Sequence, residues 1–421
     1  MTLHYYPLVL LLLTTRCLIQ TSAATFEQDV VVLSTLRSSV DDSSVTPGSC
    51  LSSWDFSVDP CDNLYSDRFT CGFACADAGG VLRLTELTLD RAGYSASLEK
   101  VPFHDAVYLQ IIDVSGNCFY GSIPESIAGL DRLTRLVLSS NLFDGSIPVS
   151  IGLARNLEEV FLDNNNLDGE VPSSFEALSS LKRLELQNNK LIGSFPLFSS
   201  DLNFLDASNN RLAGELSSFP SSVVAIILRN NSFQGRISES LRSLTYMQVL
   251  DLSYNQISGD VPSFLFVSPS LEQINLACNR FTNIQAPPAG SVLQSQLISL
   301  DLSTNQIQGV LPEFLGLMPR LSVLSLEGNR FSGSIPLGYA IKAVLPPPGV
   351  LQFSRLLLDQ NYLFGPIPPP FLWLFKKEFS FSSSSSVIRI DGNCLVRCPL
   401  RFFFCQGYSQ RNQADCSKNF S

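Results

Sequence analysis

An asparagine recurs along this chain at a nearly constant spacing, and the apolar residues before it recur with it. Leu133, Leu136 and Leu138 precede Asn141 by eight, five and three positions, and the same frame returns 24 residues later and again 24 residues after that. A period of this length is typical of a solenoid, in which each unit buries its apolar face only against its neighbours. The series is Asn117, Asn141, Asn165, Asn189, Asn210, Asn231, Asn255, Asn279, Asn305, Asn329 and Asn361, after a degenerate first copy that ends at Ala92.

Each copy of the frame predicts one short strand. Alternation places its apolar residues on one face, so we expect the strands to stack in parallel with that face buried. The asparagine lies where the chain leaves the strand, and its amide can bond backbone groups of adjacent turns. The sequence therefore predicts a buried asparagine ladder in one elongated body, not the two or three compact domains that 421 residues would otherwise suggest.

A second motif, approximately Leu-x-Gly-x-Ile-Pro, follows the asparagine in residues 119–124, 143–148, 167–172 and 331–336. Over about residues 81–370 this pattern resembles the plant-type extracellular leucine-rich repeat family, found in receptor-like kinases, receptor-like proteins and polygalacturonase-inhibiting proteins. The resemblance implies a leucine-rich repeat solenoid of the α/β horseshoe or superhelix type. Its parallel β-sheet would form the concave face, and short strands and helical turns the convex face. This scaffold is shared by different ligands and does not by itself define a function.

The two ends of the chain predict a signal peptide and two caps. An apolar run at residues 8–13, followed by Ser22, Ala23 and Ala24, is typical of a secretory signal. We therefore assign residues 1–24 to a signal peptide, with an uncleaved N-terminal anchor as the alternative. Residues 25–80 would be an N-terminal cysteine-rich cap, residues 81–370 about twelve repeats, and residues 371–421 a C-terminal cysteine-rich cap.

Cysteines cluster on both sides of the repeats. In an oxidising secretory route these cysteines are expected to form disulfides that cover the two ends of the repeat array. Each group of four cysteines allows three pairings, and the sequence does not choose among them. Zinc binding by the clustered cysteines is the alternative. Cys118 and Cys278 lie seven repeats apart, roughly 34 Å at ~4.8 Å per strand, so they cannot bridge each other. The disulfide candidates are Cys50, Cys61, Cys71, Cys75, Cys394, Cys398, Cys405 and Cys416.

Charge and composition narrow the class of protein. A net charge of −10 argues against binding to nucleic acid or to polyanionic wall polymers, and it favours a partner with a basic surface. After the signal peptide no apolar run reaches the ~18 residues that span a bilayer. His104 is the single histidine beyond residue 24, and we interpret it as a surface residue. Metalloprotease, phosphate-loop, dinucleotide and kinase motifs are absent, so we expect no enzyme, cofactor or metal, although a glycosidase carboxylate pair stays open.

The outward-facing residues of the expected concave sheet include one apolar pair. Val137 and Phe161 each lie four positions before an asparagine and would be neighbours on adjacent rungs. An exposed aromatic residue beside an apolar one is typical of a protein-binding anchor, with shielding by long neighbouring side chains as the alternative. Charged residues around the pair would orient a ligand and speed its association. They are Arg135, Glu159, Asp163, Arg183, Glu185 and Arg229.

These observations predict a secreted recognition protein that binds a protein or peptide ligand in the apoplast or cell wall. The family resemblance implies that it acts with a receptor kinase ectodomain in plant signalling or defence, which would also place it at the outer plasma membrane surface. An inhibitor of a microbial cell-wall-degrading enzyme and a wall-associated structural protein are the alternatives. Asn230 begins the sequon Asn-Asn-Ser and is a predicted glycosylation site.

Overall fold

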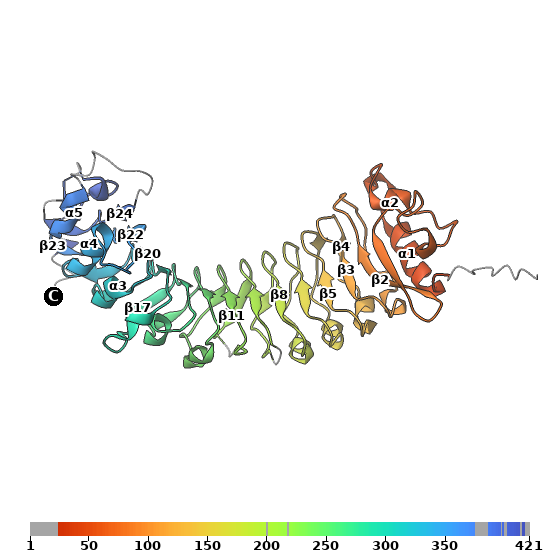
Figure 1. Cartoon of the computed structure of the whole chain (residues 1–421), viewed down its shortest axis with the longest axis horizontal. Coiled ribbons are helices and arrows are strands. Elements are labelled where there is room, and N and C mark those ends of the chain that lie inside the picture. The colour runs from red at the N-terminus through yellow and green to blue at the C-terminus, as the bar shows by residue number, and fades with distance from the viewer. Residues whose placement is uncertain are drawn as a thin grey trace, which may run out of the picture.

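The computed structural model describes residues 24–198, 201–216, 219–374, 386–396, 398–399, 402–412 and 415–416. Apart from Ala24, the predicted signal peptide lies outside these residues. The described chain forms one elongated, curved array of stacked turns, with the N-terminal cap at one end and the C-terminal cap at the other (Figure 1). The predicted leucine-rich repeat solenoid is therefore confirmed as the fold.

A single sheet of 14 strands runs along the concave face. Its first two strands are antiparallel, and every later neighbouring pair is parallel. In order the strands are β1 (Phe73–Asp77), β2 (Leu82–Thr88), β3 (Ile111–Asp113), β5 (Arg135–Val137), β7 (Glu159–Phe161), β8 (Arg183–Glu185), β10 (Phe204–Asp206), β12 (Ala225–Ile227), β14 (Val249–Asp251), β16 (Gln273–Asn275), β18 (Ser299–Asp301), β20 (Val323–Ser325), β22 (Arg355–Leu357) and β24 (Val387–Arg389).

The predicted asparagine ladder is present. Asn165 Nδ2 donates to the carbonyl oxygens of Leu138 at 2.9 Å and Leu162 at 3.2 Å, while Asn165 Oδ1 accepts from the Phe143 N–H at 3.0 Å. One side chain thus satisfies backbone groups of two successive turns. The preceding residue, Asn164, has φ 54°, a left-handed conformation that turns the chain out of the strand. Each strand ends here because the chain must cross to the other side of the coil.

Short strands and helical turns form the convex side (Figure 1). The strands pair only with their neighbours in small parallel sheets. They are β4 (Tyr120–Gly121), β6 (Leu142–Phe143), β9 (Ile192–Gly193), β11 (Arg211–Gly214), β13 (Ser232–Phe233), β15 (Ser258–Val261), β17 (Arg280–Ile284), β19 (Gln308–Val310), β21 (Arg330–Ser332), β23 (Phe364–Pro366) and β25 (Cys394–Val396).

The helical turns of this side are short 3-10 helices over most of the array and α-helices near its C-terminal end. The 3-10 turns are η3 (Phe103–Asp105), η4 (Glu125–Gly129), η5 (Val149–Leu153), η6 (Ser173–Ala177), η7 (Glu239–Ser243), η8 (Ser263–Phe266) and η9 (Ser291–Gln294). The α-helices are α3 (Glu313–Leu317), α4 (Leu337–Val344) and α5 (Pro369–Leu374). None of the helices in the described ranges is long and apolar enough to cross a membrane.

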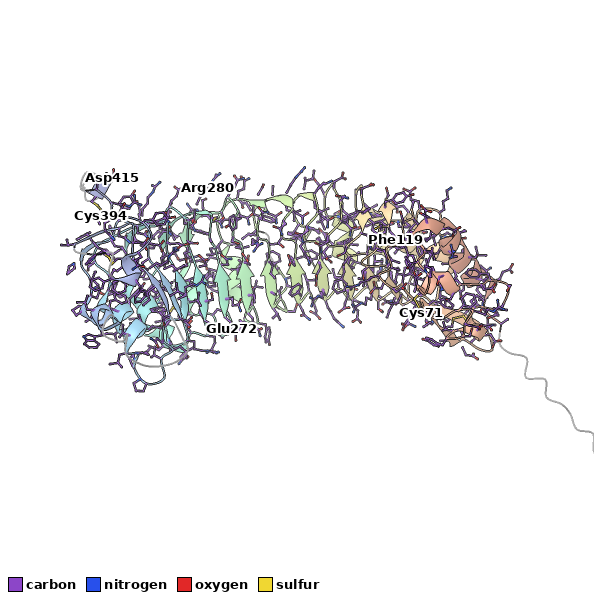
Figure 2. All side chains as sticks on the ribbon, turned by 90° about the horizontal axis from the view of Figure 1, so that it is seen from above. Cys71, Phe119, Glu272, Arg280, Cys394 and Asp415 are labelled. Atoms are coloured by element: carbon purple, nitrogen blue, oxygen red, sulfur yellow. A yellow bond between two sulfur atoms is a disulfide. The ribbon has the colours of Figure 1, made fainter. Side chains whose placement is uncertain are left out.

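Disulfide-bonded caps cover both ends of the core, as predicted. The N-terminal cap contains α1 (Glu27–Ser39), η1 (Asp42–Ser44), α2 (Cys50–Ser53) and η2 (Cys61–Asn63), and the C-terminal cap contains η11 (Phe403–Cys405). Cys71 and Cys394, labelled in Figure 2, lie at opposite ends of the array. The bridges are Cys50–Cys71, Cys61–Cys75, Cys394–Cys416 and Cys398–Cys405, while Cys118 and Cys278 carry free thiols.

Candidate recognition site on the concave sheet

Four neighbouring strands, β5, β7, β8 and β10, bring most of the predicted binding residues together. The register aligns Arg135 with Glu159, Glu159 with Arg183, and Arg183 with Phe204 in one column. A second column two residues further along the strands aligns Val137, Phe161, Glu185 and Asp206. The inward residue of each strand lies between these columns and is buried, so both columns face the concave side.

Two arginines pack against the aromatic residues of this surface. The guanidinium carbon of Arg135 lies 5.0 Å from the ring centre of Phe161, and that of Arg183 lies 5.6 Å from the same ring. Arg183 also lies 4.2 Å from the ring centre of Phe204. These are cation–π distances, so Phe161 is covered in part by charged groups and is not a bare apolar anchor. We call Arg135, Glu159, Phe161, Arg183, Glu185 and Phe204 the arginine–aromatic patch.

Each arginine is held by a carboxylate. Arg135 Nη1 lies 2.6 Å from Glu159 Oε2 on the next rung, and Arg183 Nε donates to Glu185 Oε1 at 2.7 Å on its own strand. Gln187 completes the second pair by donating to Glu185 Oε2 at 3.0 Å. The side chains of Arg135 and Arg183 stay 44% and 41% exposed. Because a guanidinium has five N–H donors, both arginines keep donors directed to solvent.

Two of the predicted contact residues are buried. Val137 is 7% exposed, so the prediction of an exposed Val137–Phe161 pair is wrong, although the two residues are neighbours in register. A short side chain beside a phenylalanine on the next rung lies below the surface that the larger residue defines. Asp163 is also 7% exposed and accepts a hydrogen bond from the Ser139 hydroxyl. Asp163 therefore stabilises the turn between two rungs and is not part of a charged rim.

Arg229 and Asn230 lie beyond the patch, after β12. Both are exposed. Asn230 Nδ2 donates to Asn209 Oδ1 at 3.0 Å, and Asn209 and Asn188 repeat this bond to their predecessors at 2.8 Å each. These asparagines occupy the left-handed position before the ladder, where Asn is tolerated better than most residues. The predicted glycosylation acceptor Asn230 therefore stands at one end of a second row of amides.

Two residues of this surface were not among the predicted contacts. Phe204 is half-buried under Arg183, and Asp206 follows it on β10. Burial raises the pKa of Asp206, and the negative charges of Glu185 and Asp163 raise it further. Phe204 could have been predicted from its position, because it lies six residues before Asn210. Arg135, Glu159 and Arg183 lie six residues before their own asparagines and form the same column.

Among the described residues, the histidine lies outside the patch. His104 lies on the convex turn η3 with its side chain 58% exposed, and its Nε2 is 3.5 Å from Asp105 Oδ1. Within the described residues no group of three or more His, Cys, Asp or Glu side chains could hold a metal ion. The patch can instead form hydrogen bonds, ion pairs and stacking contacts along an open surface.

Similarity searches return leucine-rich repeat proteins. One family model, described as leucine rich repeat, matches residues 269–331, and a second with the same description matches residues 108–130, 156–178 and 246–267. The chain is 45% identical over 47 residues to receptor-like protein 18 and 44% identical over 57 residues to the calmodulin-binding receptor kinase CaMRLK, both of Arabidopsis thaliana. These matches cover 11% and 13% of this chain but only 6% and 9% of the two relatives.

Solved structures resemble a larger part of the chain. The leucine-rich repeat ectodomain of the Arabidopsis thaliana receptor kinase GASSHO1/SCHENGEN3, in complex with CASPARIAN STRIP INTEGRITY FACTOR 2, is 26% identical with a TM-score of 0.63. The TDR receptor is 25% identical with a TM-score of 0.61. The two alignments cover 77% and 74% of this chain, and 40% and 52% of those chains. The chain therefore spans about half the length of these ectodomains or less.

Proposed function

We propose that this chain is a plant-type extracellular leucine-rich repeat protein and that it binds a peptide or protein ligand through the arginine–aromatic patch of its concave sheet. The observation that carries this proposal is the pair of half-exposed arginines stacked on Phe161 and Phe204. Arginine and aromatic residues are the types most enriched among residues that dominate binding energy. Recognition, and not catalysis, is the function that this open surface supports.

The patch suits a ligand of mixed character. Its charges balance, since Arg135 and Arg183 face Glu159 and Glu185, so neither a strongly acidic nor a strongly basic ligand is favoured by the patch alone. A peptide laid across the rungs can accept hydrogen bonds from the free guanidinium N–H groups while an apolar side chain contacts the aromatic rings. The two arginines and the two glutamates would then set the register and orientation of the bound ligand, as charged groups do at protein interfaces.

One similar solved structure supports a recognition function for this fold. GASSHO1/SCHENGEN3 is a membrane receptor kinase whose leucine-rich repeat ectodomain was solved in complex with another factor. We propose that this chain also works outside the cell, as four disulfides in its caps favour an oxidising compartment. We further propose that its complex includes a receptor kinase ectodomain, and that Asn230 is glycosylated where its side chain is exposed.

Affinity capture tests the proposal. The folded, glycosylated protein would be used to capture binders from plant tissue, alongside a Phe161→Asp variant and a Gln273→Asp control. Gln273 is an exposed residue on β16, in the same column as Arg135 but outside the patch. We expect the wild type and Gln273→Asp to retain one defined protein or peptide that Phe161→Asp loses.

Other outcomes would replace the proposal. Equal capture by a folded Phe161→Asp variant would show that the patch is not the site. Recovery of only wall-degrading hydrolases would favour an inhibitor, and salt-extractable binding to wall material without a defined protein partner would favour a structural role. Circular dichroism of each variant shows whether it is folded.

A further inference from the structure

Three acidic residues occupy the same position on the last three rungs of the concave sheet. Glu327, Asp359 and Asp391 each lie two residues before a ladder asparagine, after β20, β22 and β24 respectively. The backbone is bonded directly across this position, because the Gly328 N–H donates to the Asp359 carbonyl oxygen at 3.1 Å and the Gln360 N–H to the Asp391 carbonyl oxygen at 3.0 Å. The three residues therefore lie one above another, with backbones at the strand spacing of ~4.8 Å. We call them the acid row.

Two members of the acid row are fully buried. Asp359 and Asp391 are both 0% exposed. Within the described residues, neither carboxylate oxygen of Asp359, nor Oδ1 of Asp391, accepts a hydrogen bond from an N–H or hydroxyl group. A buried carboxylate without a donor is strongly unfavourable as an anion. A proton supplied by a neighbouring carboxyl group would give Asp359 the donor that it lacks.

Glu327 is the group that can supply this proton. It is half-exposed, and burial, followed by the charge of Asp359 and the hydrogen bond to it, raises the pKa of Glu327 to about 7. Asp301 on β18 adds negative charge nearby, and Arg389 on β24 is the positive charge that opposes it. Burial and the charge of Asp391 also raise the pKa of Asp359, while the hydrogen bond from Glu327 lowers it. The geometry fits a protonated Glu327 that donates to an ionised Asp359.

The far end of the acid row meets the C-terminal cap. Asp391 Oδ2 accepts a hydrogen bond from the Tyr408 N–H at 2.6 Å. A Cβ added to Gly407 would lie only 2.6 Å from the same oxygen, so this glycine lets the cap backbone approach the carboxylate. Arg411 extends this contact. Its backbone N–H donates to the Asn393 carbonyl oxygen at 2.7 Å, and its Nε donates to the Asn361 carbonyl oxygen at 2.7 Å. The cap segment therefore docks on the last rung beside Asp391.

We propose that the acid row is a proton-operated latch that holds the C-terminal cap on the last rung. With a proton on Glu327, the buried Asp359 carboxylate has a donor. When that proton leaves to solvent, Asp359 is left as a buried carboxylate without a donor, and this cost is relieved when the cap segment lifts and water reaches Asp359. That movement breaks the bond from Tyr408 to Asp391 and loosens residues 402–412. The inference goes beyond ligand binding at the arginine–aromatic patch and does not rest on it.

Hydrogen exchange of residues 402–412 at pH 5.5 and pH 8.0, corrected for intrinsic exchange, tests the latch. We expect the protection of these amides in the wild type to be about tenfold lower at pH 8.0 than at pH 5.5. This factor is smaller than the raised pKa of Glu327 alone would give, because solvent partly screens this side chain. Glu327→Gln keeps a permanent donor toward Asp359 and should hold the cap protected at both pH values. The control Glu313→Gln removes an exposed carboxyl on α3 and should behave as the wild type.

Asp359→Asn provides a second variant in case Glu327→Gln does not fold. An asparagine at this position removes the buried carboxylate that needs the proton of Glu327, so the pH dependence should also disappear in this variant. Equal protection of the wild-type cap at both pH values would overturn the proposal. So would a tenfold loss that persists in either folded variant.

Discussion

The buried ladder makes a quantitative prediction for Asn165→Ala. The substitution removes the only hydrogen bond of the buried Phe143 N–H, since no other acceptor among the described residues receives it. It also removes donors from the carbonyl oxygens of Leu138 and Leu162, but these keep bonds from Asn141 and Asn189 at 3.2 and 2.9 Å. One orphaned buried N–H costs about 1–3 kcal/mol, and the lost bonds add about 1 kcal/mol. We therefore expect a loss of about 3 kcal/mol in the free energy of unfolding.

The adjacent Asn164 is the matched control. Its φ of 54° is readily adopted by glycine, and its side chain bonds only Asp163 and Asn188 and no backbone group of the ladder, so Asn164→Gly should cost no more than about 1 kcal/mol. Urea unfolding followed by circular dichroism measures both variants. A folded Asn165→Ala protein within about 0.5 kcal/mol of the wild type would refute the assignment of the asparagine as a partner of otherwise unsatisfied backbone groups.

Three further predictions concern the ends of the array. Lys342 is buried, its Nζ donates to the Met318 carbonyl oxygen, and burial lowers its pKa from 10.5 to about 8. The unfolded state therefore binds more protons than the native state between these values, so stability should rise as pH increases from 8 to 10.5, and urea titrations of Lys342→Met should lack this rise. Because the pKa of Glu327 is raised from 4.5 to about 7, the native state binds more protons than the unfolded state between these values. Stability should therefore fall as pH rises from 4.5 to 7, by about 1 kcal/mol after solvent screening, and urea titrations of the wild type should lose this slope in Glu327→Gln. Replacing the Cys50–Cys71 bridge, which spans 21 residues, by two serines should cost about 3 kcal/mol in thermal unfolding, and an unchanged midpoint would show that the cap is held without it.

The repeats could be predicted from the sequence because the same residue type makes the same contacts on every rung. The spacing of Asn141 and Asn165 predicted the parallel sheet, the ladder and the place where each strand ends. Clustered cysteines likewise predicted covered ends, although the pairing of Cys50 with Cys71 needed the structure. These features depend on contacts between residues at fixed separations, so periodicity is sufficient to find them.

The solvent exposure of individual side chains on the concave sheet could not be predicted from the sequence to the same degree. The register of Val137 and Phe161 was predicted, but the burial of Val137 depends on the size of the side chain on the next rung. The cover that Arg183 provides over Phe161 depends on rotamers that alternation does not fix. Asp391 was missed for another reason, since its burial comes from the cap segment around Tyr408 and not from its own repeat.

The central claim is that the arginine–aromatic patch binds the ligand, and dissociation constants test it most directly. The partner retained by the wild type would be titrated against the wild type, Phe161→Asp and Gln273→Asp. Loss of a buried aromatic contact and of its stacked arginines should weaken binding of Phe161→Asp at least about tenfold, while Gln273→Asp stays within about twofold of the wild type. Equal affinity of a folded Phe161→Asp, or an equal loss in Gln273→Asp, would contradict the claim.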